Sequence, residues 1–342
     1  MKKKVCILSI DGGGIRGIIP GVILSYIEKK LQTHNSSIKL SDYFDLISGT
    51  STGGILACCY LIPDENNKPK YSADEAVEIY LKRGAKIFDI SLTQKFKSWG
   101  GLTDEKYSAK ELENALDDYF GNTKLSELLK PCLITAYDIR NRKAHFFNKT
   151  DTTSEIRNFY VKDMARATSA APTYFETARI KSIFNTPYAL IDGGVFANNP
   201  AMCAYSEART IDFAKITENP QKPILPFAKD MLILSMGTGT VKTPYFYDKA
   251  KDWGAVQWIK PIIDIMMSGN SETVDYQLKQ IFETTDSPNN YIRIQPDLYN
   301  ANSDMDDASK ENLDALKNAG LKYIEDNKKL LDNIVDKLIE FN

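Results

Sequence analysis

The sequence predicts an α/β fold in which a mostly parallel central sheet is covered by helices on both faces. Short apolar runs alternate with segments of helical spacing along almost the whole chain. Such alternation is typical of β-α-β units, which build parallel sheets between two layers of helices. The chain has 342 residues, of which 43% are apolar, so it has ample material for a large core.

The predicted elements follow one another in a regular order. Residues 5–10 form an apolar strand, and isoleucines and valines then recur at helical spacing as far as Ile27. A second strand within residues 43–50 leads into a short helix of small apolar residues. Further strands are predicted within residues 131–139, 143–148 (beside the preceding strand), 188–194, 230–239 and 289–295.

The loops and the C-terminal part predict one domain over residues 1–342, with a core over about 5–240 and a helical extension over about 255–342 packed on it. Residues 304–342 predict one or two amphipathic helices, with a break at Gly320. Residues 253–267 hold two tryptophans and many apolar residues. Two interpretations stay open for them: a core helix packed on the sheet, or a segment that enters a membrane surface.

Composition and charge exclude several classes of protein. The net charge is −2, whereas a nucleic-acid partner requires a basic face. The five cysteines form no CxxC pair and no Cys/His cluster, so they are interpreted as buried, reduced thiols. Three N-terminal lysines and an apolar run imitate a signal peptide, but Asp11 ends that run too early. No run of about 18 apolar residues follows, so we expect a cytoplasmic protein.

The stretch GTSTG, residues 49–53, places Ser51 between two glycines in a G-x-S-x-G pattern. It follows a predicted strand and precedes a predicted helix, which is the setting of a nucleophile elbow. There Gly49 and Gly53 would let strand and helix pack closely, and the helix N-terminus would favour negative charge near the serine. The alternative is a glycine-rich turn that caps a buried helix.

A serine nucleophile needs a base, and the chain has only two histidines. His34 lies in a polar turn and His145 in a predicted strand among aromatic residues, so a Ser-His-Asp triad fits poorly. Asp192 ends an apolar strand and is followed by two glycines. Because the ends of parallel strands gather at one edge of a sheet, Asp192 can lie near Ser51. Burial would raise its pKa toward that of a useful base.

The stretch DGGGIRG, residues 11–17, matches the dinucleotide fingerprint G-x-G-x-x-G. Pro20 is tolerated only in the first turn of a helix, so the helix starts late and the glycines form a loop before it. The acidic residue expected about 20 positions later is missing. Exposed N–H groups of Gly12, Gly13 and Gly14 would instead form an oxyanion hole. Arg16 would add positive charge there or pair with a carboxylate.

Together these motifs resemble those of the patatin-like phospholipase family. The central matches are DGGGIRG, GTSTG and the DGG of residues 192–194. Further agreement lies in ATSAAPTYF (167–175), ANNPA (197–201), LSMGTG (234–239), VDYQL (274–278), NNYIRIQ (289–295) and MDDAS (305–309). The resemblance covers nearly the whole chain, in order.

The resemblance implies a three-layer α/β/α sandwich that hydrolyses lipid acyl esters. It assigns Ser51 as nucleophile and Asp192 as base, and it assigns the oxyanion hole to Gly12, Gly13 and Gly14 with Arg16 beside them. No metal or other cofactor is expected. The expected partner is a phospholipid or another acyl-ester lipid, met by transient contact with a membrane. Alternatives are a hydrolase that serves as a messenger-activated defence effector, a non-catalytic lipid-binding or storage protein, and a nucleotide-binding enzyme.

Overall fold

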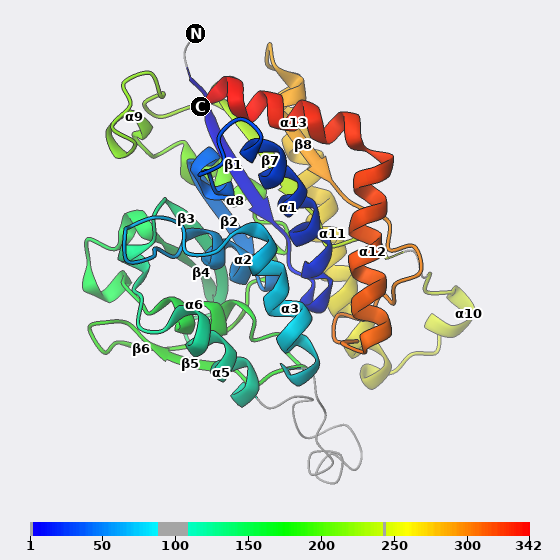
Figure 1. The fold of residues 1–342 in the computed structure, drawn as a ribbon. Coiled ribbons are helices and arrows are strands. Elements are labelled where there is room, and N and C mark those ends of the chain that lie inside the picture. Colours follow the sequence, from blue (N-terminus) through cyan, green and yellow to red (C-terminus); the bar gives the residue numbers. More distant parts are fainter. Residues whose placement is uncertain (1–2, 88–108, 242–243) are drawn as a thin grey trace.

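The computed structural model describes residues 3–87, 109–241 and 244–342. Eight strands in these ranges form one sheet of order β5-β6-β3-β2-β1-β7-β8, with β4 paired to β3 (Figure 1). The strands are β1 (Val5–Ile10), β2 (Leu46–Thr50), β3 (Cys132–Asp138), β4 (Lys143–Asn148), β5 (Ala178–Lys181), β6 (Pro187–Asp192), β7 (Met231–Met236) and β8 (Tyr291–Ile294). Each strand except β5 falls within a range predicted from the sequence or overlaps it by most of its length.

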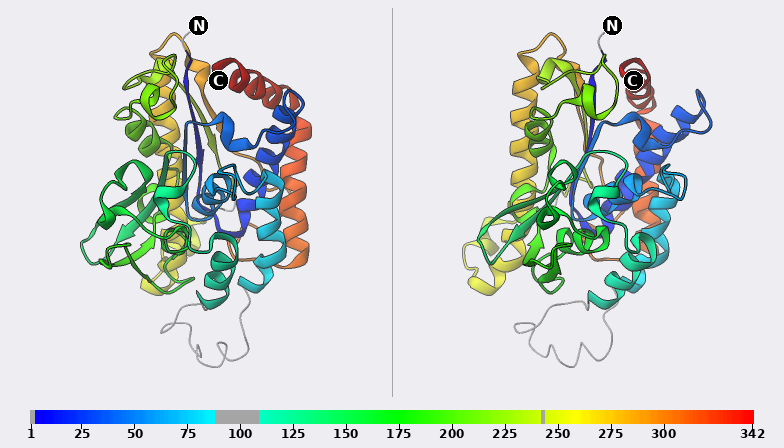
Figure 2. Two further views of the ribbon diagram at one scale, coloured as in Figure 1. Left: turned by 60° about the vertical axis from the view of Figure 1, so that its left-hand side comes forward. Right: turned by 90° about the vertical axis from the view of Figure 1, so that its left-hand side faces the viewer.

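Helices cover both faces of the sheet, so the molecule has three layers (Figure 2). The helices are α1 (Ile18–Gln32), α2 (Thr52–Leu61), α3 (Ala73–Ile87), α5 (Ala109–Phe120), α6 (Val161–Thr168), α7 (Gly194–Ala197), α8 (Ala201–Ala208), α9 (Phe213–Ile216), α10 (Tyr247–Ala250), α11 (Ala255–Glu283), α12 (Lys310–Asp326) and α13 (Lys328–Phe341). A 3-10 turn, η1 (Gly14–Gly17), precedes α1, as Pro20 predicts. No helix in the described ranges is both long and apolar enough to cross a membrane.

The strand β1 shows how the two cores are divided. Its side chains are all buried, and they alternate between the two faces of the sheet. Cys6, Leu8 and Ile10 join the larger core, together with α1, α2, α3, α12 and α13. Val5 and Ile7 join a smaller core with α8 and the C-terminal half of α11. Burial on both faces explains why the strand is a continuous apolar run.

The sheet is mixed, and the strand that carries Asp192 runs in the opposite direction to the one expected. Strands β3, β2, β1, β7 and β8 are parallel, whereas β6, which carries Asp192, runs antiparallel to β3. β2 pairs with the first half of β3 and β6 with the second half. Thr50 therefore faces Thr135 and Asp192 faces Ala136, the next residue along β3. The carboxyl ends of β2 and β6 meet head to head, so the expectation of a shared parallel edge is wrong for this strand.

Two expectations for the C-terminal part are also corrected. The helical tail breaks at Asn327, between α12 and α13, whereas Gly320 lies within α12. A Cβ atom at Gly320 would lie 2.9 Å from the Cβ of Val22, so this glycine allows close packing of α12 on α1. Residues 253–267 do not form a core helix. They lead into and begin α11, and several of their apolar side chains are exposed.

Candidate active site

Ser51 occupies the turn between β2 and α2. Its backbone has φ 55° and ψ −123°, a strained conformation for a residue other than glycine. A Cβ atom at Gly53 would lie 2.1 Å from the Ile10 carbonyl oxygen, so only glycine allows α2 to pack this closely on β1. The N–H of Ser51 donates to Thr168 Oγ1 at 2.8 Å, and that hydroxyl donates to the Thr135 carbonyl at 2.7 Å. These contacts fix a strained turn, which is typical of functional sites.

Asp192 lies beside Ser51 and is 3% exposed. Desolvation by burial raises the pKa of its carboxyl group to about 6, and a hydrogen bond from the Ser51 hydroxyl opposes the rise. The N–H of Gly194 also donates to Asp192 Oδ1 at 2.7 Å, which orients the carboxylate. The serine hydroxyl therefore interacts directly with a carboxylate whose pKa lies about one unit below neutral pH.

The glycine loop after β1 lies against the same turn. Gly14 has φ 58°, and a Cβ atom there would lie 2.1 Å from the Met305 carbonyl oxygen, so the position requires glycine. The N–H of Gly12 donates to the Asn198 carbonyl at 3.1 Å. The N–H groups of Gly13 and Gly14 donate to no acceptor among the described residues. Of the three N–H groups expected to bind an oxyanion, only those of Gly13 and Gly14 are therefore free to do so.

Arg16 is buried behind the loop. Its Nε donates to the Gly13 carbonyl at 3.4 Å, and its Nη1 has no hydrogen-bond partner. Desolvation by burial lowers the pKa of its guanidinium group. No ion pair joins Arg16 to a carboxylate within the described ranges, so of the two readings left open by the sequence, the contacts favour a positive charge beside the glycine loop.

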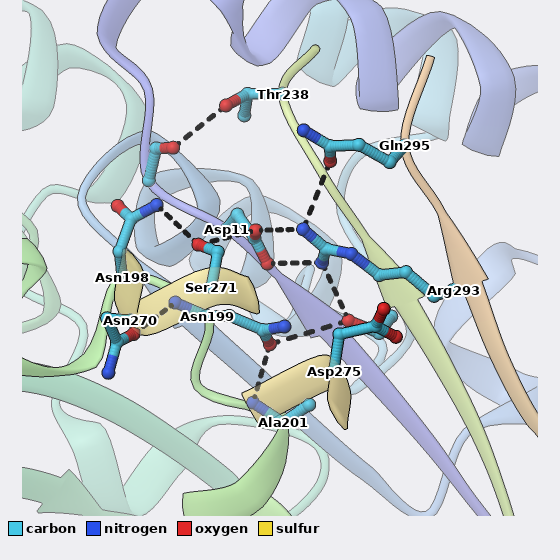
Figure 3. Close-up of polar contacts among 12 residues, drawn as sticks. Asp11, Asn198, Asn199, Ala201, Thr238, Asn270, Ser271, Asp275, Arg293 and Gln295 are labelled. Atoms are coloured by element: carbon cyan, nitrogen blue, oxygen red, sulfur yellow. Dashed lines mark hydrogen bonds and ion pairs between the residues drawn. The ribbon is translucent and has the colours of Figure 1, made fainter. Parts of the chain in front are cut away.

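A buried ion pair supports the loop from below (Figure 3). Arg293 of β8 donates from both terminal nitrogens to the two carboxylate oxygens of Asp11, at 2.8 and 2.6 Å. Ser271 of α11 donates to Asp11 and accepts a hydrogen bond from Asn198, whose carbonyl in turn binds Gly12. Thr238, after β7, donates to the Gly12 carbonyl at 2.8 Å. Four segments remote in sequence thus hold the glycine loop in one position.

This polar cluster was not predicted from the sequence, although Asp11, Asn198, Thr238 and Arg293 lie in the motifs named above. Arg293 is a charged residue inside the apolar strand YIRI, and Asp11 ends the apolar strand β1. Charged side chains are almost never fully buried unless they are paired. A positive charge within one apolar run and a negative charge directly after another are therefore a signal in the sequence for a buried ion pair.

A deep apolar cavity opens beside Ser51. Its volume is about 100 Å³. Ser51, Asp192, Gly13 and Gly14 contribute its polar end. Apolar side chains make up most of the remaining wall, and they come from α2, α3, α5, α11 and the loop after α6: Ile55, Ile79, Ile87, Leu112, Ala115, Leu116, Phe120, Pro172, Phe175, Ile263, Met266 and Met267. Such a cavity fits an acyl chain.

The two histidines take no part in the cavity wall. His34 lies exposed in the turn after α1. His145 of β4 is buried among Phe147, Phe159 and Tyr188, with ring centroids at 4.6, 5.8 and 5.2 Å. Burial lowers the pKa of His145 to about 4, so it is neutral at physiological pH. Both histidines have the structural positions expected from the sequence.

Comparison with known proteins identifies the family. The family model described as "Patatin-like phospholipase" matches residues 8–205, more than half of the chain. This chain belongs to the patatin-like phospholipase family. Patatin-like protein 2 of rice is 36% identical over 96% of this chain and 86% of its own length. Patatin group J-1 of potato is 34% identical over 94% of this chain and 84% of its own length.

Membership of the patatin-like phospholipase family supports lipid acyl hydrolase activity on acyl esters. The matched range contains the glycine loop, the Ser51 turn and Asp192, whereas Arg293 lies beyond it. Among solved structures, VipD from Legionella pneumophila aligns over 94% of this chain and 67% of its own at 13% identity, with a TM-score of 0.37. The assignment of this chain to the family therefore rests on the family model and the sequence relatives, not on this structural match.

Proposed function

We propose that this patatin-like chain hydrolyses acyl esters of membrane glycerolipids with Ser51 as nucleophile and Asp192 as general base. The observation that carries the proposal is that Ser51 and the buried Asp192 lie together at the polar end of an apolar cavity. A pKa near 6 suits a carboxylate that must accept a proton near neutral pH and later return it. A nucleotide would find few polar partners in this cavity.

The reaction has two steps. Asp192 accepts the Ser51 proton as Oγ attacks the ester carbonyl carbon, and the N–H groups of Gly13 and Gly14 stabilise the oxyanion. As the tetrahedral intermediate collapses, the C–O bond to the alcohol breaks, and Asp192 protonates the departing alcohol or lysolipid. Water then attacks the acyl-enzyme with Asp192 again as base, which releases the fatty acid and restores Ser51.

The positive charge of Arg16 and the N-terminus of α2 favour negative charge at the same place. The only base in this scheme is a carboxylate with a pKa of about 6, whose conjugate acid protonates alkoxide leaving groups far more readily than it assists amide cleavage. We therefore expect esters to be cleaved much faster than amides of the same acyl chain.

The test compares the wild type with Ser51→Ala and Asp192→Asn on a soluble acyl ester. Both substitutions should lower kcat by at least about a thousandfold, because removing one member of a catalytic unit removes most of its effect. A fluorophosphonate probe should label Ser51 in the folded wild type. The absence of an adduct, or near-wild-type turnover by Asp192→Asn, would contradict the assignment.

A further inference from the structure

We infer that the first half of α11 and the segment that precedes it form a membrane-docking face, and that its partner is the surface of a lipid bilayer. This inference rests on the proposed lipid hydrolase function and names the surface through which the cavity receives its substrate. The docking face is defined by eight exposed apolar side chains: Phe246, Tyr247, Val256, Trp258, Ile259, Ile262, Ile265 and Met266.

The docking face is continuous with the cavity. Met266 is 47% exposed and also lines the cavity that contains Ser51. Ile263 and Met267, on the neighbouring face of the same helix, line the cavity wall. One helix therefore presents one face to the acyl site and the adjoining face to solvent. An acyl chain that leaves a membrane along this helix stays in contact with apolar surface until it reaches Ser51.

The face is an ordered surface. Trp253 packs against Tyr245 and Trp258 with ring centroids at 5.5 and 5.0 Å. The Tyr245 hydroxyl donates to Asp264 on α11 at 2.9 Å. These contacts fasten the segment before α11 onto the helix. They also gather tryptophan and tyrosine, the residues that favour the boundary between lipid and water.

Position and charge agree with a bilayer partner. Figure 1 shows α10 and the beginning of α11 at the end of the molecule to which the carboxyl ends of β1 and β2 point. The charged residues of this segment and of the first half of α11 are Asp248, Lys249, Lys251, Asp252, Lys260 and Asp264, three of each sign, so their charges cancel. Attraction to anionic headgroups is therefore a small part of the binding, and the burial of apolar side chains is the main part.

The binding test uses phosphatidylcholine vesicles and sedimentation, with Ser51→Ala as the background so that no lipid is consumed. Ile262→Asp combined with Ile265→Asp should weaken vesicle binding by at least about tenfold, because two half-exposed isoleucines lose their insertion into lipid. The matched control is Ile224→Asp combined with Leu225→Asp, two exposed aliphatic residues after α9. The control should bind within about twofold of the background.

A second variant guards against a folding defect in α11. Phe246→Ser combined with Tyr247→Ser changes the two most exposed aromatic residues of the face, which lie before α11, and should also weaken vesicle binding. Raising the salt from about 0.1 to about 0.5 M should change binding by less than about threefold, since the local charges cancel. Steep loss of binding with salt would overturn the apolar docking face.

Hydrolysis of a short soluble ester separates this inference from the proposed reaction. With Ser51 intact, the α11 variant should keep kcat/KM for that ester within about twofold of the wild type while losing vesicle binding. Vesicle binding equal to the background in both face variants, or no vesicle binding by the background itself, would overturn the docking face. Failure of the wild type to cleave the soluble ester would instead contradict the proposed hydrolase.

Discussion

Asp192 combines two properties that work against each other. Its carboxyl group is buried, which raises its pKa to about 6 and destabilises the charged form in the folded protein. In the proposed reaction, the charged form is the one that accepts the Ser51 proton. The burial that would give the proposed base a useful strength therefore also lowers the stability of the folded protein, and both effects can be measured at this residue.

The first consequence is a pH-dependent rate. Hydrolysis of a soluble ester should rise as pH increases through about 6, because only the ionised Asp192 accepts the Ser51 proton. The measurement is kcat/KM between about pH 4.5 and pH 8.5. A profile that is flat down to about pH 4.5 would show that a different group is the base.

The second consequence is a gain in stability when the charge is removed. The folded pKa of about 6 exceeds the ordinary aspartate value of 3.8, so the folded state binds more protons between these values and stability falls as pH rises through that window. Above the window the penalty is fully present. Asp192→Asn should therefore raise the free energy of unfolding near pH 8 by roughly 1–3 kcal/mol and change it little below about pH 4. Urea unfolding at both pH values measures this, and an unchanged stability near pH 8 would contradict the penalty.

At the scale of elements, the site depends on segments that meet from several parts of the fold. The glycine loop follows β1, and it is held by β8, by the turn after β7 and by the middle of α11. Burial lowers the pKa of the Arg293 guanidinium, but the charge of Asp11 outweighs it and leaves that pKa above its ordinary value. The loop is therefore anchored by a charged, bidentate contact.

Breaking this anchor should affect both stability and turnover. Arg293→Leu leaves Asp11 charged and unpaired in the interior, so we expect a loss of about 3–5 kcal/mol in the free energy of unfolding. We also expect kcat to fall in the folded fraction, because the oxyanion donors are displaced. Lys222→Leu is the matched control, since Lys222 forms a buried pair with Asp45 at 2.8 Å, away from the cavity wall. Equal kcat in the two folded variants would contradict a positioning role for Arg293.

The helix α5 gives the cavity one of its walls, and this wall should set the acyl-chain length. α5 packs against α3 and α6, and Ala115 faces the cavity from it. Ala115→Phe should lower kcat/KM for a long-chain ester relative to a short-chain ester by roughly tenfold or more. Asn114→Phe, an exposed neighbour on α5, is the control. An unchanged ratio of the two esters in Ala115→Phe would contradict this role for the wall.

At the scale of the whole molecule, the C-terminal part completes both the core and the site. β8 extends the sheet beside β7 and carries Arg293, while α12 and α13 bury Leu316, Leu331 and Leu338 in the larger core. We therefore propose that residues 1–342 act as one domain in which the region after about residue 255 is indispensable to the fold.

The close packing of α12 on α1 allows a test of whether the C-terminal helices unfold together with the rest of the domain. Gly320→Val introduces side-chain atoms where a Cβ would already lie 2.9 Å from Val22 Cβ, so we expect a loss of about 1–3 kcal/mol in stability. Asn318→Val, at an exposed position of the same helix, controls for the change in helix propensity. A single cooperative unfolding transition at lower urea is expected for Gly320→Val. A separate early transition, with the rest unchanged, would show that the extension folds independently.

Much of the fold was predictable from the sequence because its signals are local. The apolar runs of β1, β2, β3 and β7 and the helical spacing of α1 reflect burial within each element. The late helix start after the glycines follows from the backbone of Pro20 alone. The break between α12 and α13 was not predictable in this way, because Gly320 serves a contact with another helix rather than a helix end.

The sequence by itself determined which residues are candidates for chemistry, since Ser51, Asp192 and the glycine loop stand in recognisable local patterns. Only the tertiary structure decided how they meet. β6 runs antiparallel to β3, so Asp192 reaches Ser51 from the opposite direction to the one expected. The Gly12 donor is occupied by Asn198, and Arg293 anchors the loop across 282 positions of sequence. Strand direction and long-range pairing depend on contacts between distant segments, which no local pattern encodes.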